Sequence, residues 1–460
     1  MPQFEIKDSV AIIPEGTTVI EFAAFKNCVE LHSVTIPESV TTIESYAFRG
    51  CSSLENIIIP ISVTKIGTGA FDGCTSLKNI TIPESVTDIN PSAFYGCTSL
   101  ESITIPESVT KIGECAFEGC TSLASIVVAD GNPVYDSREG CNAIIETTTN
   151  TLIKGCKTTV IPNSVTKIQF DAFKGCTSLE SIAIPNSVTW IGDDVFSGCT
   201  SLKSIAIPKS VTTICGFSGC TSLESITIPE SVTEISRHTF KDCTSLKNVT
   251  IPGSVTEIGD CAFLGCISLE SVTIPNGVTS IGEFVFRGCT SLERVIIPDS
   301  VTSIRCGAFE GCTSLKSITI PNSVTKIGYE AFNGCTSLES ITIPESVTEI
   351  GRDAFTGCTS LKSITIPAST TVLYWPIFKG CASLESIVVA EGNPMYDSRE
   401  GCNAIVETDT NTIVTGCATT IIPESVTKIG PEAFAGCSSL QSITIPSSVT
   451  EIDYCAFKGC

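Results

Sequence analysis

The chain has 460 residues, of which 42% are hydrophobic and 17% are charged. It therefore has enough apolar material to fold throughout and too little charge for a disordered chain. The formal net charge of -22, from 49 acidic and 27 basic residues, argues against nucleic acid as a partner, because phosphate binding requires clustered Lys and Arg. Polar residues or prolines interrupt every apolar run before the roughly 18 residues of a membrane span, so we expect no direct membrane insertion.

The first residues of the chain predict a capping strand. Phe4, Ile6, Val10 and Ile12 supply apolar positions ahead of the first full repeat, so residues 1–12 are a candidate N-terminal cap. The same segment has neither the basic nor the apolar region of a secretory signal. The sequence thus leaves two locations open: the cytoplasm, or a cell surface or secreted location for a chain whose leader has been removed.

A unit of 23 residues recurs along nearly the whole chain. Residues 105–123 show it as Ile-Pro-Glu-Ser-Val-Thr-Lys-Ile-Gly-Glu-Cys-Ala-Phe-Glu-Gly-Cys-Thr-Ser-Leu. A period of roughly 20 to 29 residues with Leu and Ile at fixed offsets is typical of leucine-rich repeats. One such unit cannot bury its own apolar edge. We therefore expect about eighteen units to stack into a single solenoid domain over residues 1–460.

Each unit contains one predicted strand and one predicted return. Residues 100–105, Leu-Glu-Ser-Ile-Thr-Ile, alternate inward Ile with outward Ser and Thr, and Pro106 ends the strand. In residues 109–120 the apolar side chains recur three to five residues apart, a spacing that favours turns with at most a single helical turn. The resulting fold class is a curved, right-handed leucine-rich-repeat superhelix with a parallel concave sheet, an irregular convex side and a stacked spine of Phe side chains such as Phe94 and Phe117.

Two inserted modules interrupt the period at about 127–160 and 388–421. Both contain the string Gly-Asn-Pro-x-Tyr-Asp-Ser-Arg-Glu-Gly-Cys-Asn-Ala-Ile. Each then continues into a predicted hairpin that turns at residues 149–150 in the first module and at 410–411 in the second. We interpret each module as an insertion that projects from the solenoid without ending it.

The string at residues 105–123, which returns at 343–361, closely resembles the BspA-type leucine-rich repeats of bacterial surface antigens and of some protozoan parasites. The module strings resemble versions from gut and oral Bacteroidetes. The resemblance covers nearly the whole chain. It implies a surface or secreted protein that adheres to host matrix proteins or to other cells, and it carries no residue-level binding motif.

The 26 cysteines are the most conspicuous residue type. Seventeen occupy one repeat position, and we interpret them as small side chains buried once in each turn. A ladder of disulfides between these cysteines is an open alternative, because the expected Cα–Cα distance between stacked turns falls within bridging range. Cys141 with Cys156 and Cys402 with Cys417 recur at equal spacing, which makes a bridge within each module the clearest redox hypothesis. The chain has no Cys-x-x-Cys and two His residues, a pattern that argues against a zinc site.

The sequence contains none of the common catalytic signatures, such as Gly-x-x-x-x-Gly-Lys-Ser/Thr, Gly-x-Ser-x-Gly or His-Glu-x-x-His. We therefore predict no enzyme, no cofactor and no metal. Binding is instead expected on the concave sheet, at Ser102, Thr104 and their equivalents. The modules add further candidate partner-binding residues, which alternatively hold the module's own turn: Tyr135, Asp136, Arg138, Glu139, Tyr396, Asp397, Arg399 and Glu400. Trp190, Tyr374 and Trp375 depart from the repeat and are candidate anchors.

These features predict a non-catalytic interaction protein with a protein partner, such as a host matrix protein or glycoprotein. The first hypothesis is adhesion at the cell surface or after secretion, through many weak polar contacts on the concave face. The alternative hypothesis is an intracellular leucine-rich-repeat scaffold that mediates protein–protein interaction. The sequence does not identify the partner, because near-identical units encode little readable specificity.

Overall fold

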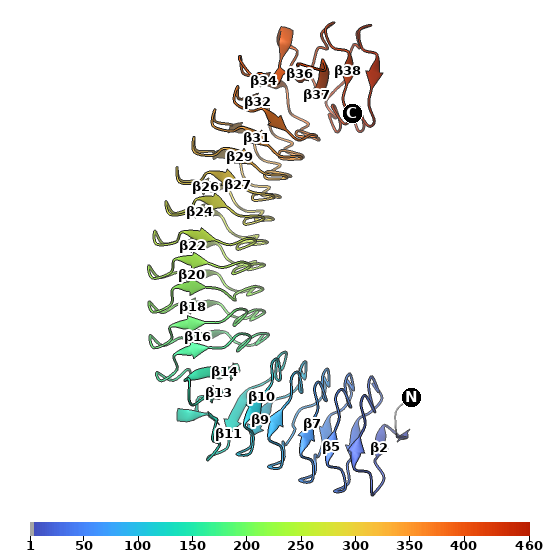
Figure 1. Ribbon diagram of the computed structural model, residues 1–460, viewed down its shortest axis with the longest axis vertical. Coiled ribbons are helices and arrows are strands. Elements are labelled where there is room, and N and C mark those ends of the chain that lie inside the picture. Colours follow the sequence, from blue (N-terminus) through green and yellow to red (C-terminus); the bar gives the residue numbers. More distant parts are fainter. Residues whose placement is uncertain (1–3) are drawn as a thin grey trace. The chain divides into compact units, whose positions relative to one another are not determined.

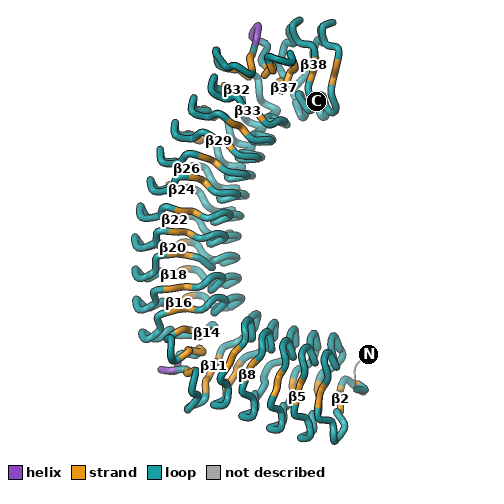
Figure 2. Tube along the Cα trace, in the orientation of Figure 1, coloured by secondary structure: helices purple, strands orange, loops and turns teal. Residues whose placement is uncertain are grey.

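The computed structural model describes residues 4–460, which fall into two compact units divided between Leu223 and Glu224. Each unit is a solenoid of short parallel strands joined by turns (Figure 1). In the described residues, helix is confined to two short 3-10 turns, η1 (Arg138–Gly140) and η2 (Arg399–Gly401), drawn in purple in Figure 2. The leucine-rich-repeat solenoid predicted from the period is confirmed.

The predicted strand of each 23-residue repeat pairs in parallel with the strands of neighbouring turns, and these strands, which fall into several sheets, are here called the serine-threonine ladder. In it, Ile103 of one turn lies opposite Ile126 of the next. Inward Ile and Val side chains are buried, whereas most outward Ser and Thr side chains are exposed. In the first unit the ladder comprises β2 (Val10–Ile12), β4 (Ser33–Thr35), β6 (Asn56–Ile57), β9 (Ser102–Ile105), β11 (Ser125–Val128), β16 (Ser181–Ala183) and β18 (Ser204–Ala206). In the second unit it comprises β20 (Ser225–Thr227), β22 (Asn248–Thr250), β24 (Ser271–Thr273), β26 (Arg294–Ile296), β28 (Ser317–Thr319), β30 (Ser340–Thr342), β32 (Ser363–Ile366) and β34 (Ser386–Val389).

The return of each 23-residue repeat consists of turns, as predicted, and also contains a two-residue strand that the sequence analysis did not predict. These strands pair in parallel between neighbouring turns, in several sheets, and are here called the two-residue ladder. Hydroxyl groups support the ladder from turn to turn, as where Ser346 Oγ donates to the carbonyl oxygen of Val324 over 2.7 Å. In the first unit it comprises β3 (Val19–Ile20), β5 (Thr42–Ile43), β7 (Lys65–Ile66), β8 (Asp88–Ile89), β10 (Lys111–Ile112), β15 (Lys167–Ile168), β17 (Trp190–Ile191) and β19 (Thr213–Ile214). In the second unit it comprises β21 (Glu234–Ile235), β23 (Glu257–Ile258), β25 (Ser280–Ile281), β27 (Ser303–Ile304), β29 (Lys326–Ile327), β31 (Glu349–Ile350), β33 (Val372–Leu373), β38 (Lys428–Ile429) and β39 (Glu451–Ile452).

The core of each unit is a column of stacked Phe rings. Phe309 and Phe332 are fully buried, their ring centroids lie 5.4 Å apart, and their planes differ by 8°. In the first unit, Phe71 stacks on Phe94 at 5.6 Å and Phe94 on Phe117 at 5.5 Å. The predicted aromatic spine is therefore confirmed on either side of each module, at a spacing that suits offset stacking. Among the described residues no ring contact joins Phe117 to Phe173, or Phe378 to Phe434, so the stack is interrupted at both modules.

The repeat-position cysteines pack beside this spine as the sequence predicts, and all of them are buried except Cys460. Within residues 4–460 the cysteines are not joined in disulfides. In the first module, Cys141 Sγ donates to the carbonyl oxygen of Ala143 and Cys156 Sγ to that of Asn142. The structure therefore shows separate thiols where a bridge within the module was hypothesised.

Each module contains the predicted hairpin, but the module does not project from the solenoid. In the first module, β12 (Tyr135–Asp136), β13 (Ala143–Glu146) and β14 (Thr151–Gly155) are antiparallel, and β14 then pairs in parallel with β15. In the second, β35 (Tyr396–Asp397), β36 (Ala404–Glu407) and β37 (Thr412–Gly416) repeat the arrangement, with β37 beside β38. The projecting arrangement is thus wrong, because the module's last strand extends the two-residue ladder and most of the module's apolar side chains are buried in the core, although Val160 and Ile421 are exposed.

The N-terminal segment contains a hairpin in which β1 (Ile6–Lys7) pairs antiparallel with β2. Asp8 and Ser9 turn the hairpin at φ angles of 52° and 65°. The ring of Phe4 lies 5.7 Å from that of Phe25 and so covers the first ring of the spine. Residues 1–3 of the predicted cap lie outside the described residues.

Candidate interaction surfaces

The outward face of the serine-threonine ladder carries the first group of predicted binding residues. On β9, Thr104 is exposed and Ser102 is partly buried. On β20, β22 and β24 both outward side chains are exposed. On β26 the pattern changes, because Arg294 and Ile296 replace Ser and Thr, and Ile296 is 52% exposed.

The predicted module tyrosines lie inside the protein. Tyr135 is 7% exposed, and its hydroxyl oxygen accepts a hydrogen bond from the backbone N–H of Ile112 over 3.3 Å. Tyr396 is 5% exposed in the second module. Burial raises the pKa of both phenols above the ordinary tyrosine value. These two side chains therefore anchor the modules to the preceding turns.

In each module the predicted Asp and Arg side chains pair with each other. Arg138 Nη2 lies 2.7 Å from Asp136 Oδ2, and Arg138 Nη1 donates to Asn150 Oδ1 over 2.9 Å. The Asp397–Arg399 pair repeats the contact at 2.8 Å. These contacts join the strand before the 3-10 turn to the hairpin. They correspond to the alternative in the sequence analysis, in which these residues hold the module's own turn.

The remaining predicted module residues, Glu139 and Glu400, have exposed side chains. They adopt φ angles of 58° and 57° within η1 and η2. Of the eight predicted module residues, these two present their side chains most openly to a partner.

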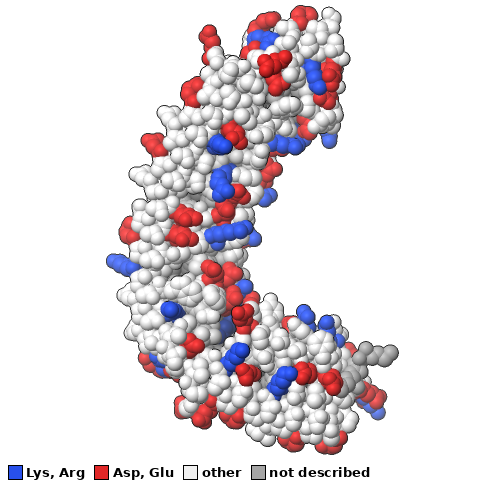
Figure 3. Space-filling view, in the orientation of Figure 1, with Lys and Arg blue, Asp and Glu red and all other residues white. Residues whose placement is uncertain are grey.

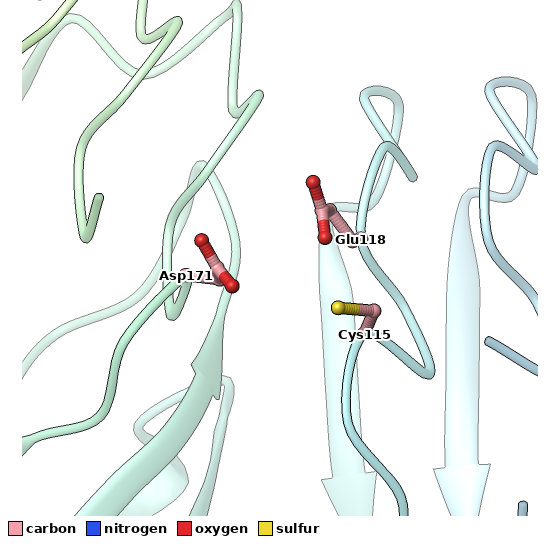
Figure 4. A group of neighbouring side chains, drawn as sticks. All are labelled: Cys115, Glu118 and Asp171. Atoms are coloured by element: carbon pink, nitrogen blue, oxygen red, sulfur yellow. The ribbon is translucent and has the colours of Figure 1, made fainter. Parts of the chain in front are cut away.

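A cavity of about 360 Å³ lies beside the first module, between the turn before it and the turn after it, and is lined in part by Phe117, Ile153 and Phe170. At its rim, Cys115 and Glu118 come from one turn and Asp171 from the other (Figure 4). Their sulfur and carboxylate oxygen atoms lie within 4.8 Å of one another. This is a grouping of residue types that can bind a metal, which the sequence analysis did not detect because Asp171 is distant in the chain.

An ammonium group already occupies this grouping. Lys174 Nζ lies 3.2 Å from Glu118 Oε1 and 3.1 Å from Asp171 Oδ1. Burial, together with a hydrogen bond to Glu118, raises the pKa of the Cys115 thiol to about 11, so it is protonated at neutral pH. The arrangement therefore serves as an ion pair that closes the edge of the module, and the second module has a counterpart in Lys379 and Glu432, 2.6 Å apart.

A groove of about 530 Å³ in the second unit is lined by four aromatic side chains together with Leu, Pro, Arg and Glu residues, and we call it the aromatic groove. Tyr329 and Tyr374 meet edge to face, with ring centroids 5.4 Å apart and an interplanar angle of 69°. The side chains that define the groove are Tyr329, Tyr374, Trp375, Tyr454, Arg352 and Glu432. The sequence analysis marked Tyr374 and Trp375 as candidate anchors and missed Tyr329 and Tyr454. The missed signal is their common offset, since Tyr329, Trp375 and Tyr454 each stand two positions after the last residue of a two-residue strand.

Charged side chains of both signs lie interspersed on the face shown in Figure 3. Several charged side chains of the chain form exposed ion pairs between neighbouring turns, such as Lys326 with Glu349 at 2.9 Å and Lys203 with Glu180 at 3.2 Å. Each such pair contributes little to stability. Among the described residues, 4–460, no helix combines the length and hydropathy required to cross a bilayer.

Comparison with known proteins agrees with this architecture. The family model described as BspA type leucine rich repeat region (6 copies) matches residues 7–132, 153–269, 215–335, 279–396 and 415–460. A search of curated proteins found no match.

Several solved structures are similar to the chain. A leucine-rich repeat protein from Eubacterium ventriosum is 26% identical, with 70% of this chain and 82% of that chain covered and a TM-score of 0.52. One from Bacteroides ovatus is 27% identical over 95% of this chain and 87% of that chain, with a TM-score of 0.46. A leucine rich cell surface protein from Faecalibacterium prausnitzii is 33% identical over 62% of this chain and 78% of that chain, with a TM-score of 0.47. Since the family model matches most of the sequence, the chain belongs to the BspA-type leucine-rich repeat family.

Proposed function

We propose that the chain is a non-catalytic interaction protein that binds a partner protein on the outward face of the serine-threonine ladder. The observation that carries this proposal is on β26, where Arg294 and Ile296 are exposed on the same strand, whereas the exposed Ile12 of β2 has no Arg beside it. Arg is enriched among the few residues that supply most of the binding energy of protein interfaces. Arg294 fits that preference.

The surrounding face suits binding for two physical reasons. Ser and Thr side chains are short, and Thr is stiff at χ1, so ordering them on a partner costs little side-chain entropy. The backbone groups of the strands are already paired between turns, as β20 is with β22 and β24 with β26. The hydroxyl groups are therefore the polar groups that exchange water for a partner.

We further propose that the partner is a protein of a host or of a neighbouring cell, bound in adhesion. This follows the resemblance of the repeats to those of bacterial surface antigens. The flat, repetitive face supports it, because many weak polar contacts along a solenoid add up to a stable interface.

The test uses the whole chain and purified fibronectin, laminin and collagen, each immobilised in turn, with affinity measured by surface plasmon resonance. The double variant Arg294→Ser with Ile296→Thr gives β26 the side chains of its neighbours, so the fold should be kept. We expect its Kd for the bound matrix protein to rise at least about tenfold, equivalent to about 1.4 kcal/mol.

The matched control is Lys209→Asn, which removes an exposed positive charge in a turn outside the ladder. Its Kd should equal that of the unmodified chain. An unchanged Kd for the double variant would place the contact elsewhere, and no binding to any of the three matrix proteins would contradict the adhesive role.

A further inference from the structure

We propose that the cavity beside the first module binds a free α-amino acid with an apolar side chain. The proposal goes beyond the function above, because it concerns a cavity and a small molecule instead of the ladder face and a partner protein. It is carried by a buried lysine, by carboxylates at the rim and by the residue that joins the two.

The buried charge of the cavity is Lys154. This residue belongs to β14, lines the cavity and is 8% exposed. Its Nζ atom donates a hydrogen bond to the carbonyl oxygen of Asp171 over 3.3 Å, which uses one of its three N–H donors. In the described part of the chain, the ion pairs of Lys side chains do not include Lys154. A lysine is seldom buried without an anionic partner, so the carboxylate of a ligand would match this ammonium group.

Carboxylates at the rim form the opposite pole of the cavity. Glu118 and Asp171, on facing turns in Figure 4, share the ammonium group of Lys174 at 3.2 and 3.1 Å and so keep one negative charge in excess. Glu114 also lines the cavity, and its side chain is exposed. The rim therefore attracts a cationic group and disfavours a ligand that is only anionic, such as phosphate. The two poles together match a zwitterion.

Asp171 belongs to both poles and so keeps them close together. Its backbone carbonyl oxygen contacts Lys154 Nζ, and its carboxylate belongs to the rim. Within one Asp residue only Cα and Cβ separate these two groups. An α-amino acid carries its ammonium and carboxylate groups on a single Cα atom, so its charges have a similarly short separation. A zwitterion with several carbon atoms between its charges would match the two poles less well.

The rest of the lining suits an apolar side chain. Ile112, Phe117 and Ile153 line the cavity, together with Phe170, which is 51% exposed. The volume of about 360 Å³ falls within the range of roughly 300–1,000 Å³ that is typical of small-molecule sites. Such sites combine mainly apolar walls with a few polar groups that orient the ligand. The cavity therefore fits an amino acid of the leucine, methionine or phenylalanine type.

The second module has the same strands but a different set of charges. Thr415 stands in β37 where Lys154 stands in β14, directly before the last Gly of the strand. Lys379 takes the place of Glu118 and pairs with Glu432. The space beside Thr415 has a volume of about 10 Å³. We therefore expect one amino-acid site per chain, and the second module supplies the substitution that tests it.

The first test is isothermal titration calorimetry of the full chain with L-leucine, L-methionine and L-phenylalanine. We expect one site per chain and a Kd below about 1 mM for at least one of them. The N-acetyl derivative of the tightest-binding amino acid lacks the ammonium group, its amide lacks the carboxylate, and 6-aminohexanoate holds the two charges further apart. Each of these three analogues should bind at least tenfold more weakly. These comparisons use the unmodified chain, so they do not depend on the folding of a variant.

The second test is Lys154→Thr, which gives the first module the residue of the second, so the fold should be kept. Its Kd for the tightest-binding amino acid should rise at least tenfold. The matched control is Lys157→Thr, which removes the same charge at an exposed position outside the cavity lining and should leave the Kd unchanged. Absence of saturable binding of all three amino acids, equal affinity for any of the three analogues, or an unchanged Kd for Lys154→Thr would each overturn the proposal. None of these outcomes bears on the ladder face around Arg294.

Discussion

The thiol of Cys312 donates a hydrogen bond to the carbonyl oxygen of Phe286, 26 residues earlier in the chain, over 3.2 Å. The same bond joins Cys335 to Phe309 and Cys358 to Phe332. In these turns the cysteine column links each turn to the Phe of the turn before it. The small thiol side chain fills the space and adds a second hydrogen bond to the Phe286 carbonyl oxygen, which also accepts from the backbone N–H of Cys289.

Cys312→Ala should destabilise the turns around it by about 1–2 kcal/mol, because it removes both a hydrogen bond and buried volume. Amide hydrogen exchange of the turns that contain Phe286 and Phe309 measures this locally, which suits a repeat protein whose turns open separately. Cys306→Ala is the control, since Cys306 is only partly buried and lies outside the column. Equal effects of the two substitutions would show that the hydrogen bond contributes nothing.

The folded chain should lose stability in alkaline solution. Burial raises the pKa of the Cys289, Cys335 and Cys381 thiols from 9.0 to about 12. A raised folded-state pKa gives stability that is complete below the unfolded-state pKa and is lost as the pH rises toward the folded-state value. The unfolding temperature should therefore be steady up to about pH 8 and fall between pH 9 and pH 12. An unfolding temperature that stays constant to pH 11 would contradict this account.

Phe309→Ala should cost about 3–5 kcal/mol, because it leaves a cavity in the aromatic spine between two stacked neighbours. Phe309 is fully buried, with rings 5.5 Å away on one side and 5.4 Å away on the other. Phe170→Ala removes a side chain that is 51% exposed and should cost less than about 1 kcal/mol. Urea unfolding of both variants, with hydrogen exchange to place the loss, checks the contrast.

The repeat made much of the fold predictable from the sequence. Ile103, Phe117 and Cys120 stand at offsets that recur in turn after turn, so one assignment applies to all units. The two-residue ladder escaped because two residues are too few to show the alternation that predicts a strand. Its existence depends on neighbouring turns supplying the hydrogen-bond partners, as β10 and β8 do for each other.

The candidate sites were less predictable, because they depend on contacts between turns. Tyr135 is of a residue type that is common at binding surfaces, yet the preceding turn buries it, and the backbone N–H of Ile112 donates a hydrogen bond to its hydroxyl oxygen. The aromatic groove arises from single departures such as Tyr329 and Tyr454, which look like surface variation until the turns are aligned. Sequence periodicity identifies the common positions, whereas these departures have to be placed in space.

The junction between module and solenoid gives a last prediction. Gly155 ends β14 against the ring of Phe173, and a Cβ atom on Gly155 would lie 2.2 Å from Phe173 Cε1. Gly155→Ala should therefore force the module and the next turn apart, at a cost of about 1–3 kcal/mol. The control is Gly253→Ala, because no atom lies within 4 Å of the added Cβ.

The cause can be separated from a general effect of the substitution by a second change at the contact. Adding Phe173→Leu to Gly155→Ala makes room for the new methyl group, so the double variant should lose less than the sum of the two single losses. Gly416 and Phe434 repeat the contact in the second module, where a Cβ atom added to Gly416 would lie 2.2 Å from Phe434 Cε1. Gly416→Ala should therefore destabilise the second module as Gly155→Ala does the first. Strict additivity in the double variant, measured by urea unfolding, would mean that the close approach of ring and glycine does not fix the module in the ladder.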